Sequence, residues 1–157
     1  MRNSDAILNC LMNVVLAANP GEKKEAMEEL ERIRSRQVMT QKDPEMIVRD
    51  LLLEMCAPEH QIGFEYVVRA ILLCADTRKW IDNITLGLYP QLATEFDTTP
   101  SRVERAIRHV IETIWSRTNY NTLDKYFGSS VSPEKGKPTN GEFLARMANI
   151  VKMELKR

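Results

Sequence analysis

Four basic side chains and one acidic side chain gather in the stretch 101–117, and they have the clearest capacity for specific chemistry in this chain. The set is Arg102, Glu104, Arg105, Arg108 and His109. An arginine can fork onto O6 and N7 of guanine, and a glutamate can accept from N4 of cytosine. These residue types, clustered in this way, indicate contact with the edges of DNA bases.

The same spacing also has a purely structural interpretation. Glu104 and Arg108 are four residues apart, as are Arg108 and Glu112. On a helix this spacing permits weak ion pairs, each worth about 0.2–0.5 kcal/mol. A solvated face that pairs with itself is therefore the alternative at this point.

An α-helix over 101–117 is expected to hold these side chains. Its apolar residues recur at steps of three and four and form one inward face: Val103, Ala106, Ile107, Val110, Ile111, Ile114 and Trp115. Ser101 precedes Glu104 by three residues, which is a capping-box pattern, so we expect the helix to start at Ser101. At ~1.5 Å per residue the helix would be about 25 Å long, and its N-terminal half could enter a DNA major groove.

A second amphipathic helix is predicted over 83–96. Four apolar residues recur there at intervals of four: Ile84, Leu88, Leu92 and Phe96. Pro90 either occupies the first turn of this helix or kinks it, because proline lacks the donor that an interior turn needs. Only the short polar stretch 97–100 separates the two helices. A helix, a tight turn and a basic helix make the helix-turn-helix arrangement.

The amino-acid order in these segments resembles one family. Residues 88–93 (LYPQLA), 96–99 (FDTT) and 101–112 (SRVERAIRHVIE) are similar to the C-terminal DNA-binding domain of the stage-zero sporulation response regulator, the master regulator of endospore formation. Further matching segments are 63–66, 69–71, 115–117, 127–128 and 137–143. The resemblance extends over roughly residues 43 to 155.

The resemblance implies an all-α fold, with a compact helical effector domain that contains the helix-turn-helix at 43–157. The target implied is double-stranded DNA with a box like TGTCGAA and a second copy of that box for a dimer. We expect base contacts from Arg102, Glu104, Arg105 and Arg108. We expect phosphate contacts from Thr99, Ser101, His109, Lys135 and Lys137. Thr99 and Ser101 lie at a helix N-terminus, which favours anions, and the two lysines lie in the predicted loop 129–139.

Residues 1–42 depart from the family, whose N-terminal part is a phosphorylated receiver domain. The segment is too short for such a domain, so phosphorelay control is not expected. We predict a helical hairpin instead. Its first helix has a wide apolar face of Ile7, Leu8, Leu11, Met12, Val15 and Leu16, and its second, 22–36, has a narrow stripe of Ala26, Met27, Leu30 and Ile33. The wide face must dock on the effector domain or on another copy, and we favour a homodimer.

Composition limits the remaining functions. Lys+Arg and Asp+Glu both number 22, a balance that argues against non-specific coating of nucleic acid. Cys10, Cys56 and Cys74 lie in apolar runs without a ligand pattern and are expected to be buried free thiols, so no metal or cofactor is expected. A polar stripe at Asp5, Asn9 and Asn13 argues against a signal peptide or a membrane span, which predicts a cytoplasmic protein.

The rest of the effector domain reads as core-forming helices. Asp43 and Pro44 are expected to open a helix whose inward residues are Met46, Ile47, Leu51 and Met55, with Val48 and Leu52 flanking them. A further helix is predicted over 63–75. Asn140 is expected to cap the last helix, which turns Phe143, Leu144, Met147, Ile150 and Val151 inward.

No motif supports catalysis. Glu54, Glu59 and His60 are read as part of a surface turn rather than as an acid–base group. Two non-enzymatic alternatives stay open beside DNA reading. One is a protein-interaction module, such as a decoy that pairs with a full-length regulator, and the other is a repressor whose hairpin senses a small molecule. Contact with the sigma subunit of RNA polymerase is a further open expectation.

Overall fold

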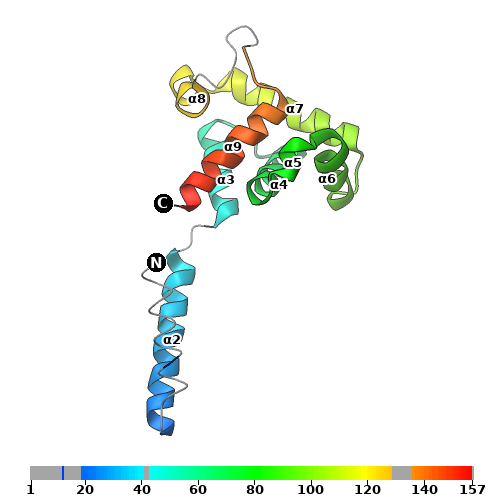
Figure 1. Ribbon diagram of the computed structural model, residues 1–157. Helices are drawn as coiled ribbons and strands as arrows, with labels where there is room; N and C mark the ends of the chain where they lie inside the picture. The colour runs from blue at the N-terminus through cyan, green and yellow to red at the C-terminus, as the bar shows by residue number, and fades with distance from the viewer. Residues whose placement is uncertain (1–11, 13–18, 41–42, 129–135, 157) are drawn as a thin grey trace. The chain divides into compact units, whose positions relative to one another are not determined.

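The structure is a computed structural model that describes residues 12, 19–40, 43–128 and 136–156 (Figure 1). Every regular element in these ranges is helical, so the predicted all-α fold is confirmed. In chain order the elements are α2 (Pro20–Thr40), α3 (Pro44–Glu54), α4 (Ile62–Asp76), α5 (Lys79–Asp82), the π-helix η1 (Ile84–Leu88), α6 (Tyr89–Glu95), α7 (Pro100–Arg117), α8 (Tyr120–Phe127) and α9 (Asn140–Leu155).

The chain divides into two compact units, residues 1–42 and residues 43–157. In the first unit α2 begins after Asn19, whose side-chain oxygen accepts from the backbone N–H of Glu22 at 2.9 Å. The expected first helix of the hairpin lies outside the described residues except for Met12, and so does Cys10. None of the described helices is both long enough and apolar enough to cross a membrane.

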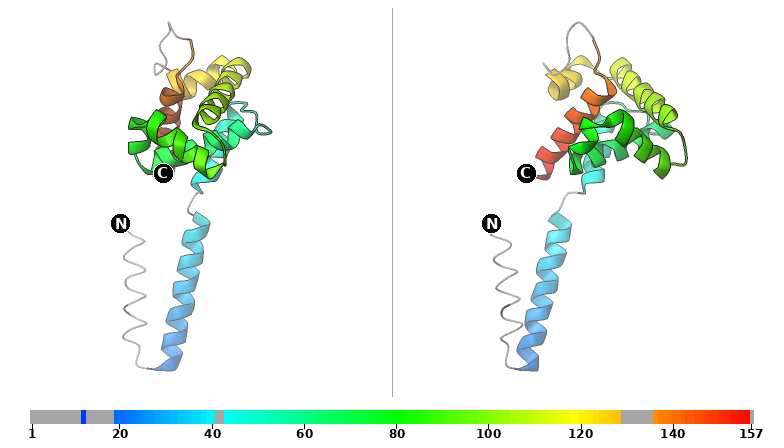
Figure 2. Two further views of the ribbon diagram at one scale, coloured as in Figure 1. Left: turned by 90° about the vertical axis from the view of Figure 1, so that its right-hand side faces the viewer. Right: turned by 45° about the vertical axis from the view of Figure 1, so that its right-hand side comes forward.

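Helix α4 is the centre of the second unit, because α3, α5, α6, α7 and α9 all pack against it. Its side chains Phe64, Val67 and Ile71 are fully buried. Figure 2 shows α7 at the periphery of this unit, where only one of its faces meets the other helices. The predicted inward faces of α7 and α9 are confirmed, with Ala106, Trp115 and Ile150 partly buried and the others buried: Val103, Ile107, Val110, Ile111, Ile114, Phe143, Leu144, Met147 and Val151.

Helix α3 starts as predicted, and three of the four residues expected to face the core do so, since Leu51 and Met55 are buried and Ile47 is partly buried. The Asp43 carboxylate accepts from the backbone N–H of Glu45 at 2.9 Å, and Pro44 takes the first helical position. The inward placement of Met46 was wrong, because its side chain is 62% exposed. Val48 and Leu52, expected only to flank the core, are fully buried. Apolar residues are consecutive at 46–48 and at 51–53, so periodicity does not select one face within either run.

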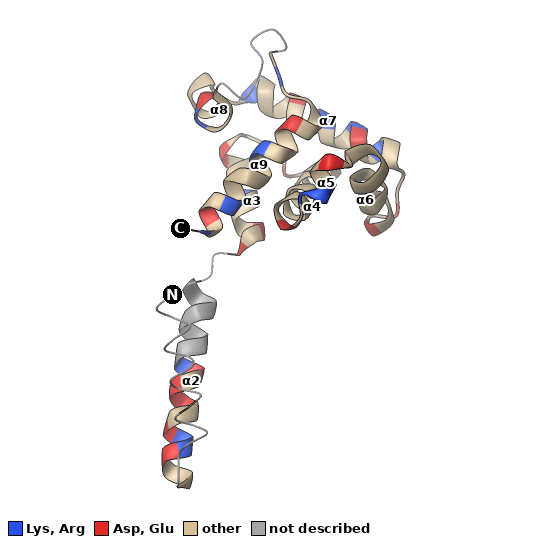
Figure 3. Ribbon diagram, viewed as in Figure 1, with Lys and Arg blue, Asp and Glu red and all other residues tan. Residues whose placement is uncertain are grey.

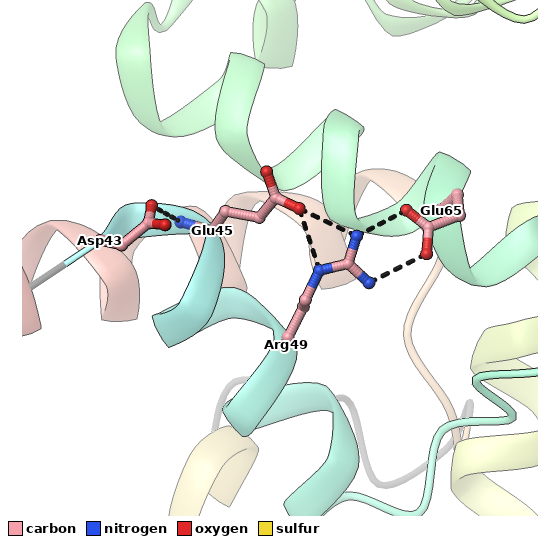
Figure 4. A network of polar contacts seen from close by, with 4 residues as sticks. All are labelled: Asp43, Glu45, Arg49 and Glu65. Atoms are coloured by element: carbon pink, nitrogen blue, oxygen red, sulfur yellow. Dashed lines mark hydrogen bonds and ion pairs between the residues drawn. The ribbon is translucent and has the colours of Figure 1, made fainter.

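An arginine clamp joins α3 to α4 (Figure 4). The guanidinium of Arg49 donates to both carboxylate oxygens of Glu65, at 2.9 and 2.7 Å, and its Nε donates to Glu45 at 3.0 Å. Two parallel N–H···O bonds fix the geometry of the pair as well as its distance. The hydrogen bonds from Arg49 lower the pKa of the Glu65 carboxyl. The clamp thus holds α3 and α4 together while Arg49 and Glu65 are both charged.

The segment expected to be one helix over 83–96 consists of two elements. Its first part, η1, is a π-helix in which the Leu88 N–H donates to the Asn83 carbonyl at 3.1 Å. Its second part is α6, and Pro90 lies in the first turn of α6. A proline ring collides with the carbonyl four residues earlier in an α-helix, here that of Leu86. The wider π turn over that stretch is a way to avoid the collision.

The expectation that all three cysteines are buried is wrong for Cys56. Cys74 is buried, and this burial raises the pKa of its thiol to about 11. Cys56 is exposed and has a φ of 55°, in the left-handed region. It follows the end of α3, where the Cys56 N–H donates to Leu53 and the Ala57 N–H donates to Leu52. This is a Schellman closure with cysteine in the place that glycine usually occupies.

Candidate nucleic-acid interface

Helix α7 begins one residue earlier than predicted and uses a different cap. The side-chain oxygen of Thr99 accepts from the backbone N–H of Arg102 at 3.4 Å, and Pro100 takes the first helical position. The expected cap at Ser101 was therefore wrong, since Ser101 is already the second helical residue. Proline favours the first position because its fixed φ suits a helix and its missing donor would be unpaired there anyway. Glu104 consequently has no capping role.

A tight turn of four residues, 96–99, separates α6 from α7. Phe96 is the C-cap of α6, Asp97 takes a φ of 48°, and the Thr98 N–H donates back to the Ala93 carbonyl at 2.8 Å. This Schellman closure satisfies the last carbonyls of α6 and reverses the chain within one turn. The helix-turn-helix predicted from the sequence is therefore present, built from α6, the turn 96–99 and α7.

Two contacts fix α6 beneath this turn. The Arg69 guanidinium of α4 forks onto the Glu95 carboxylate, at 2.7 Å from Nε and 3.1 Å from Nη2. The rings of Tyr66 and Phe96 meet edge to face with their centroids 4.8 Å apart. Both contacts come from α4, so the central helix sets the position of the helix-turn-helix.

Basic positions recur along α7, as the blue segments of that helix in Figure 3 show. Arg102, Arg105, Arg108 and His109 are all exposed, and Glu104 is half-buried. The neighbouring core of the unit covers only the opposite, apolar face. The charged face is therefore available to a partner rather than packed against its own protein.

Within the described ranges, ion pairing on this face is limited to one long contact. Arg108 and Glu104 lie 3.7 Å apart, with 48% and 47% of their side chains exposed. An exposed pair of this kind contributes little to stability. Among the described residues, no acidic side chain pairs with Arg102 or Arg105. No ion pair joins Arg108 and Glu112, the second pair of the structural alternative, in the described part of the chain, and Glu112 binds another residue.

That residue is Lys137, in the segment that leads into α9. Its ammonium lies 2.7 Å from the Glu112 carboxylate, and this hydrogen bond lowers the pKa of Glu112. Next to it, the indole N–H of Trp115 donates to the Gly136 carbonyl at 2.8 Å. Two bonds thus fasten this segment to the C-terminal half of α7. Lys135, the other lysine expected to contact phosphate, lies outside the described residues.

The C-terminal end of α7 closes without a glycine. Thr118 has extended backbone angles, φ −78° and ψ 139°, and its buried hydroxyl donates to the Met55 carbonyl. A side-chain hydrogen bond to the end of α3 thus anchors this end of α7.

Asn140, Tyr89 and Gly63 hold the N-terminal half of α7, a role that the sequence did not predict for them. Asn140 donates from Nδ2 to the Tyr89 hydroxyl at 3.0 Å and to the Glu104 backbone carbonyl at 3.2 Å. At Gly63 a Cβ atom would lie 2.8 Å from the Ala106 carbonyl oxygen, so α4 approaches α7 closely there. The signal for Gly63 was present in the sequence, since a glycine in the first turn of an apolar helix often marks close packing.

Asn140 was expected to cap α9, and this expectation was wrong. The cap is Thr139, whose hydroxyl accepts from the Glu142 N–H at 3.2 Å while the Glu142 carboxylate accepts from the Thr139 N–H at 2.7 Å. This is a complete capping box. Asn140 is therefore the first residue inside the helix, and its side chain is free to turn into the core.

The acidic residues near His60 do not form an acid–base group. Glu54 accepts from the Lys125 ammonium at 2.7 Å and from the Tyr126 hydroxyl at 2.5 Å, which lowers the pKa of its carboxyl. Glu59 and His60 are exposed in the turn between α3 and α4. In the part of the chain that the structure describes, no three His, Cys, Asp or Glu residues are grouped to hold a metal ion.

A comparison with known families identifies one match. The model of the family described as "Sporulation initiation factor Spo0A C terminal" matches residues 48–151. The match includes α4, α6, α7 and α8 entirely and most of α3 and α9, so it covers the helix-turn-helix together with the helices that support it.

Proposed function

Because this chain belongs to the family of the sporulation initiation factor Spo0A C-terminal domain, a DNA-binding regulatory domain, we propose that it is a transcription regulator that reads a TGTCGAA-like box with α7. The observation that carries the proposal is the exposed row of arginines on α7 within a helix-turn-helix. In this motif the second helix lies in the major groove and presents its N-terminal residues to base edges.

The base contacts are assigned to Arg102, Glu104, Arg105 and Arg108. Arg102 and Arg105 have exposed guanidinium groups without an acidic partner among the described residues, so each can fork onto a guanine without first breaking an ion pair. Glu104 is released from capping by Thr99, and its carboxylate can accept from a cytosine amino group. Arg108 pairs with Glu104 in the free protein, so we assign it to an outer base of the box.

The phosphate contacts are assigned to Thr99, Ser101, His109, Lys135 and Lys137. The Thr99 oxygen accepts a hydrogen bond from the helix backbone, which leaves its O–H free to donate to a phosphate oxygen. The backbone N–H of Ser101 is one of the first N–H groups of α7, which have no partner within the helix and favour an anion. Lys137 has to exchange Glu112 for a phosphate, or bind it while still paired.

The proposal also assigns partners. Double-stranded DNA is the principal partner, and a second copy of the chain would occupy the second box. Residues 1–42 are assigned to this self-association. The sigma subunit of RNA polymerase is the proposed protein partner at promoters. A regulator that acts in this way works on DNA in the cytoplasm and needs no cofactor.

A second candidate is a protein-interaction module, such as a decoy for a full-length regulator, that keeps the fold without productive DNA binding. Two of the assigned DNA residues favour it, because Arg108 and Lys137 both face carboxylates in the free protein. The chain also has a formal net charge of zero. Both features weaken the attraction of the whole molecule to DNA.

The test is selection of bound sequences from a random DNA pool with the purified full chain, together with a sizing measurement on the free protein and on the complex. We expect enrichment of a TGTCGAA-like box, occupied by two copies of the chain. Recovery of unenriched DNA would reject sequence-specific reading. Such a result, combined with co-purification of a full-length regulator, would favour the decoy.

A further inference from the structure

We infer that Asn140 is a positioning residue for the base-reading half of α7, an inference that rests on the proposed function. Its side chain is 96% buried by the fold, with 4% of the residue exposed. Its Nδ2 donates to the Tyr89 hydroxyl of α6 at 3.0 Å and to the Glu104 carbonyl of α7 at 3.2 Å. One amide at the start of α9 therefore joins both helices of the helix-turn-helix.

The chemistry of the three groups fixes the orientation of this amide. A backbone carbonyl can only accept, so the nitrogen of Asn140 and not its oxygen must face Glu104. The amide nitrogen carries two N–H donors, and each has one acceptor here. The Tyr89 hydroxyl is uncharged at neutral pH, as for any tyrosine, and burial raises its pKa further. The Glu104 carbonyl thus fixes which way the Asn140 amide faces, and both N–H donors of that amide are used.

The point of attachment on α7 coincides with the proposed readout. The carbonyl that Asn140 holds belongs to Glu104, and Arg105 is the next residue. Gly63 lets α4 closely approach the carbonyl of Ala106, two residues after Glu104. Residues 104–106 are thereby held from two sides, by α9 and by α4. Readout of base edges requires side chains within about 0.5 Å of their productive position, so a fixed backbone at this turn favours specificity.

The capping box of α9 completes the arrangement. Thr139 and Glu142 satisfy the first N–H groups of the helix between themselves, so the Asn140 side chain has no capping duty. The same box fixes the backbone from which the Asn140 side chain extends. The order Thr139, Asn140, then Glu142 therefore combines a helix start with an inward-pointing amide.

The experiment compares Asn140→Ala with a matched control, Thr118→Val, in the full chain. Thr118 is also buried, and its hydroxyl also anchors α7, but at the opposite end, through the Met55 carbonyl. Each variant removes one buried polar anchor of the same helix. Three quantities are measured for each: Tm, the ratio of Kd values on the selected box and on random DNA, and amide hydrogen exchange over residues 103–109.

Both variants are expected to lower Tm. Only Asn140→Ala is expected to reduce the preference for the selected box, by about tenfold, which corresponds to the loss of roughly one base contact. Only Asn140→Ala should accelerate hydrogen exchange in the N-terminal half of α7. If Asn140→Ala fails to fold, Tyr89→Phe removes just one of the two acceptors and should reduce the preference by about threefold.

Equal changes of the DNA preference in Asn140→Ala and Thr118→Val would overturn the inference, as would unchanged exchange over residues 103–109 in Asn140→Ala. A wild-type chain that binds both DNAs equally would refute the proposed function. The exchange measurement needs no DNA and would still decide whether Asn140 fixes this half of α7, so the two failures are distinguishable.

Discussion

Replacing Gly63 by alanine is expected to destabilise the second unit and to weaken sequence-specific binding at the same time. A Cβ at this position would lie 2.8 Å from the Ala106 carbonyl oxygen and 3.0 Å from Cγ2 of Val110. The first contact is with helix backbone, which cannot rotate away, so α4 and α7 must separate. Overpacking of this kind costs about 1–3 kcal/mol.

Part of that cost is recovered, because alanine favours a helix over glycine by about 1 kcal/mol. The net loss is then about 1 kcal/mol, with an upper value near 2 kcal/mol, and Tm should fall by about 4–8 °C. Since Ala106 adjoins Arg105, the same displacement moves a proposed base contact. The preference for the selected box should therefore fall together with Tm.

The assay is thermal unfolding followed by circular dichroism, with Kd measured by fluorescence anisotropy on the selected box. Gly141→Ala is the matched control, because Gly141 is likewise the second residue of a helix. Its Cβ would lie 3.0 Å from Cδ1 of Ile84, the mobile end of a side chain, so this variant should be neutral or more stable. If Gly63→Ala melts like Gly141→Ala, the close approach of α4 to α7 does not determine stability.

Three further outcomes follow from other contacts. Glu112→Gln removes the acidic partner of Lys137 and should tighten binding to selected and random DNA alike by about threefold. This gain in affinity should be absent when Lys137→Ala is also present, and a gain that persists there would contradict the pairing. Cys56→Gly relieves a left-handed cysteine and should raise stability by about 0.5–1 kcal/mol in denaturant unfolding, whereas a loss would argue against strain at this end of α3. Arg49 lowers the folded-state pKa of Glu65. The contribution of Glu65 to the free energy of unfolding is therefore present above its unfolded pKa of about 4.3, and it is lost as pH falls through the folded value. Glu65→Gln should flatten the acid limb of a stability–pH curve, and an unchanged limb would refute the linkage.

Much of the helical plan was accessible from the sequence, because it depends on local signals. The spacing of apolar residues fixed the inward face of α7, and its outward arginines followed from the same period. Asp43 and Pro44 identified the start of α3, where cap and first position both have strong preferences. The pattern of polar and apolar residues predicts which side of a helix faces solvent, even when the element that packs on the other side is unknown.

The N-caps of α7 and α9 were predicted at the wrong residue because two possible capping residues lie close together at each helix start. Ser101 and Glu104 have capping-box spacing, but Thr99 caps α7 because Pro100 takes the first helical position. At α9 the correct signal was also visible, since Thr139 and Glu142 are three residues apart. In both cases the competing residue lies within two positions, so local pattern alone resolves the helix but not its first residue.

Contacts between distant parts of the chain were not accessible. The Asn140 amide meets Tyr89, 51 residues away in the sequence, and no local pattern announces that pair. The exposure of Met46 likewise depends on how α3 is rotated against α4, where Arg49 and Glu65 lock the register. Sequence reasoning thus found the side chains proposed to meet DNA, while the residues that hold their backbone in place required the structure.

The most direct test of the central claim, that the exposed arginines of α7 read base edges, is the effect of Arg105→Ala on Kd for the selected box and for random DNA at one salt concentration. Lys137→Ala serves as the phosphate-contact control. We expect Arg105→Ala to weaken binding to the selected box by about 5- to 150-fold more than binding to random DNA, as for one lost bidentate contact of about 1–3 kcal/mol. Lys137→Ala should weaken both by a similar factor and flatten the salt dependence. Equal losses on the two DNAs for Arg105→Ala would contradict base reading by this helix.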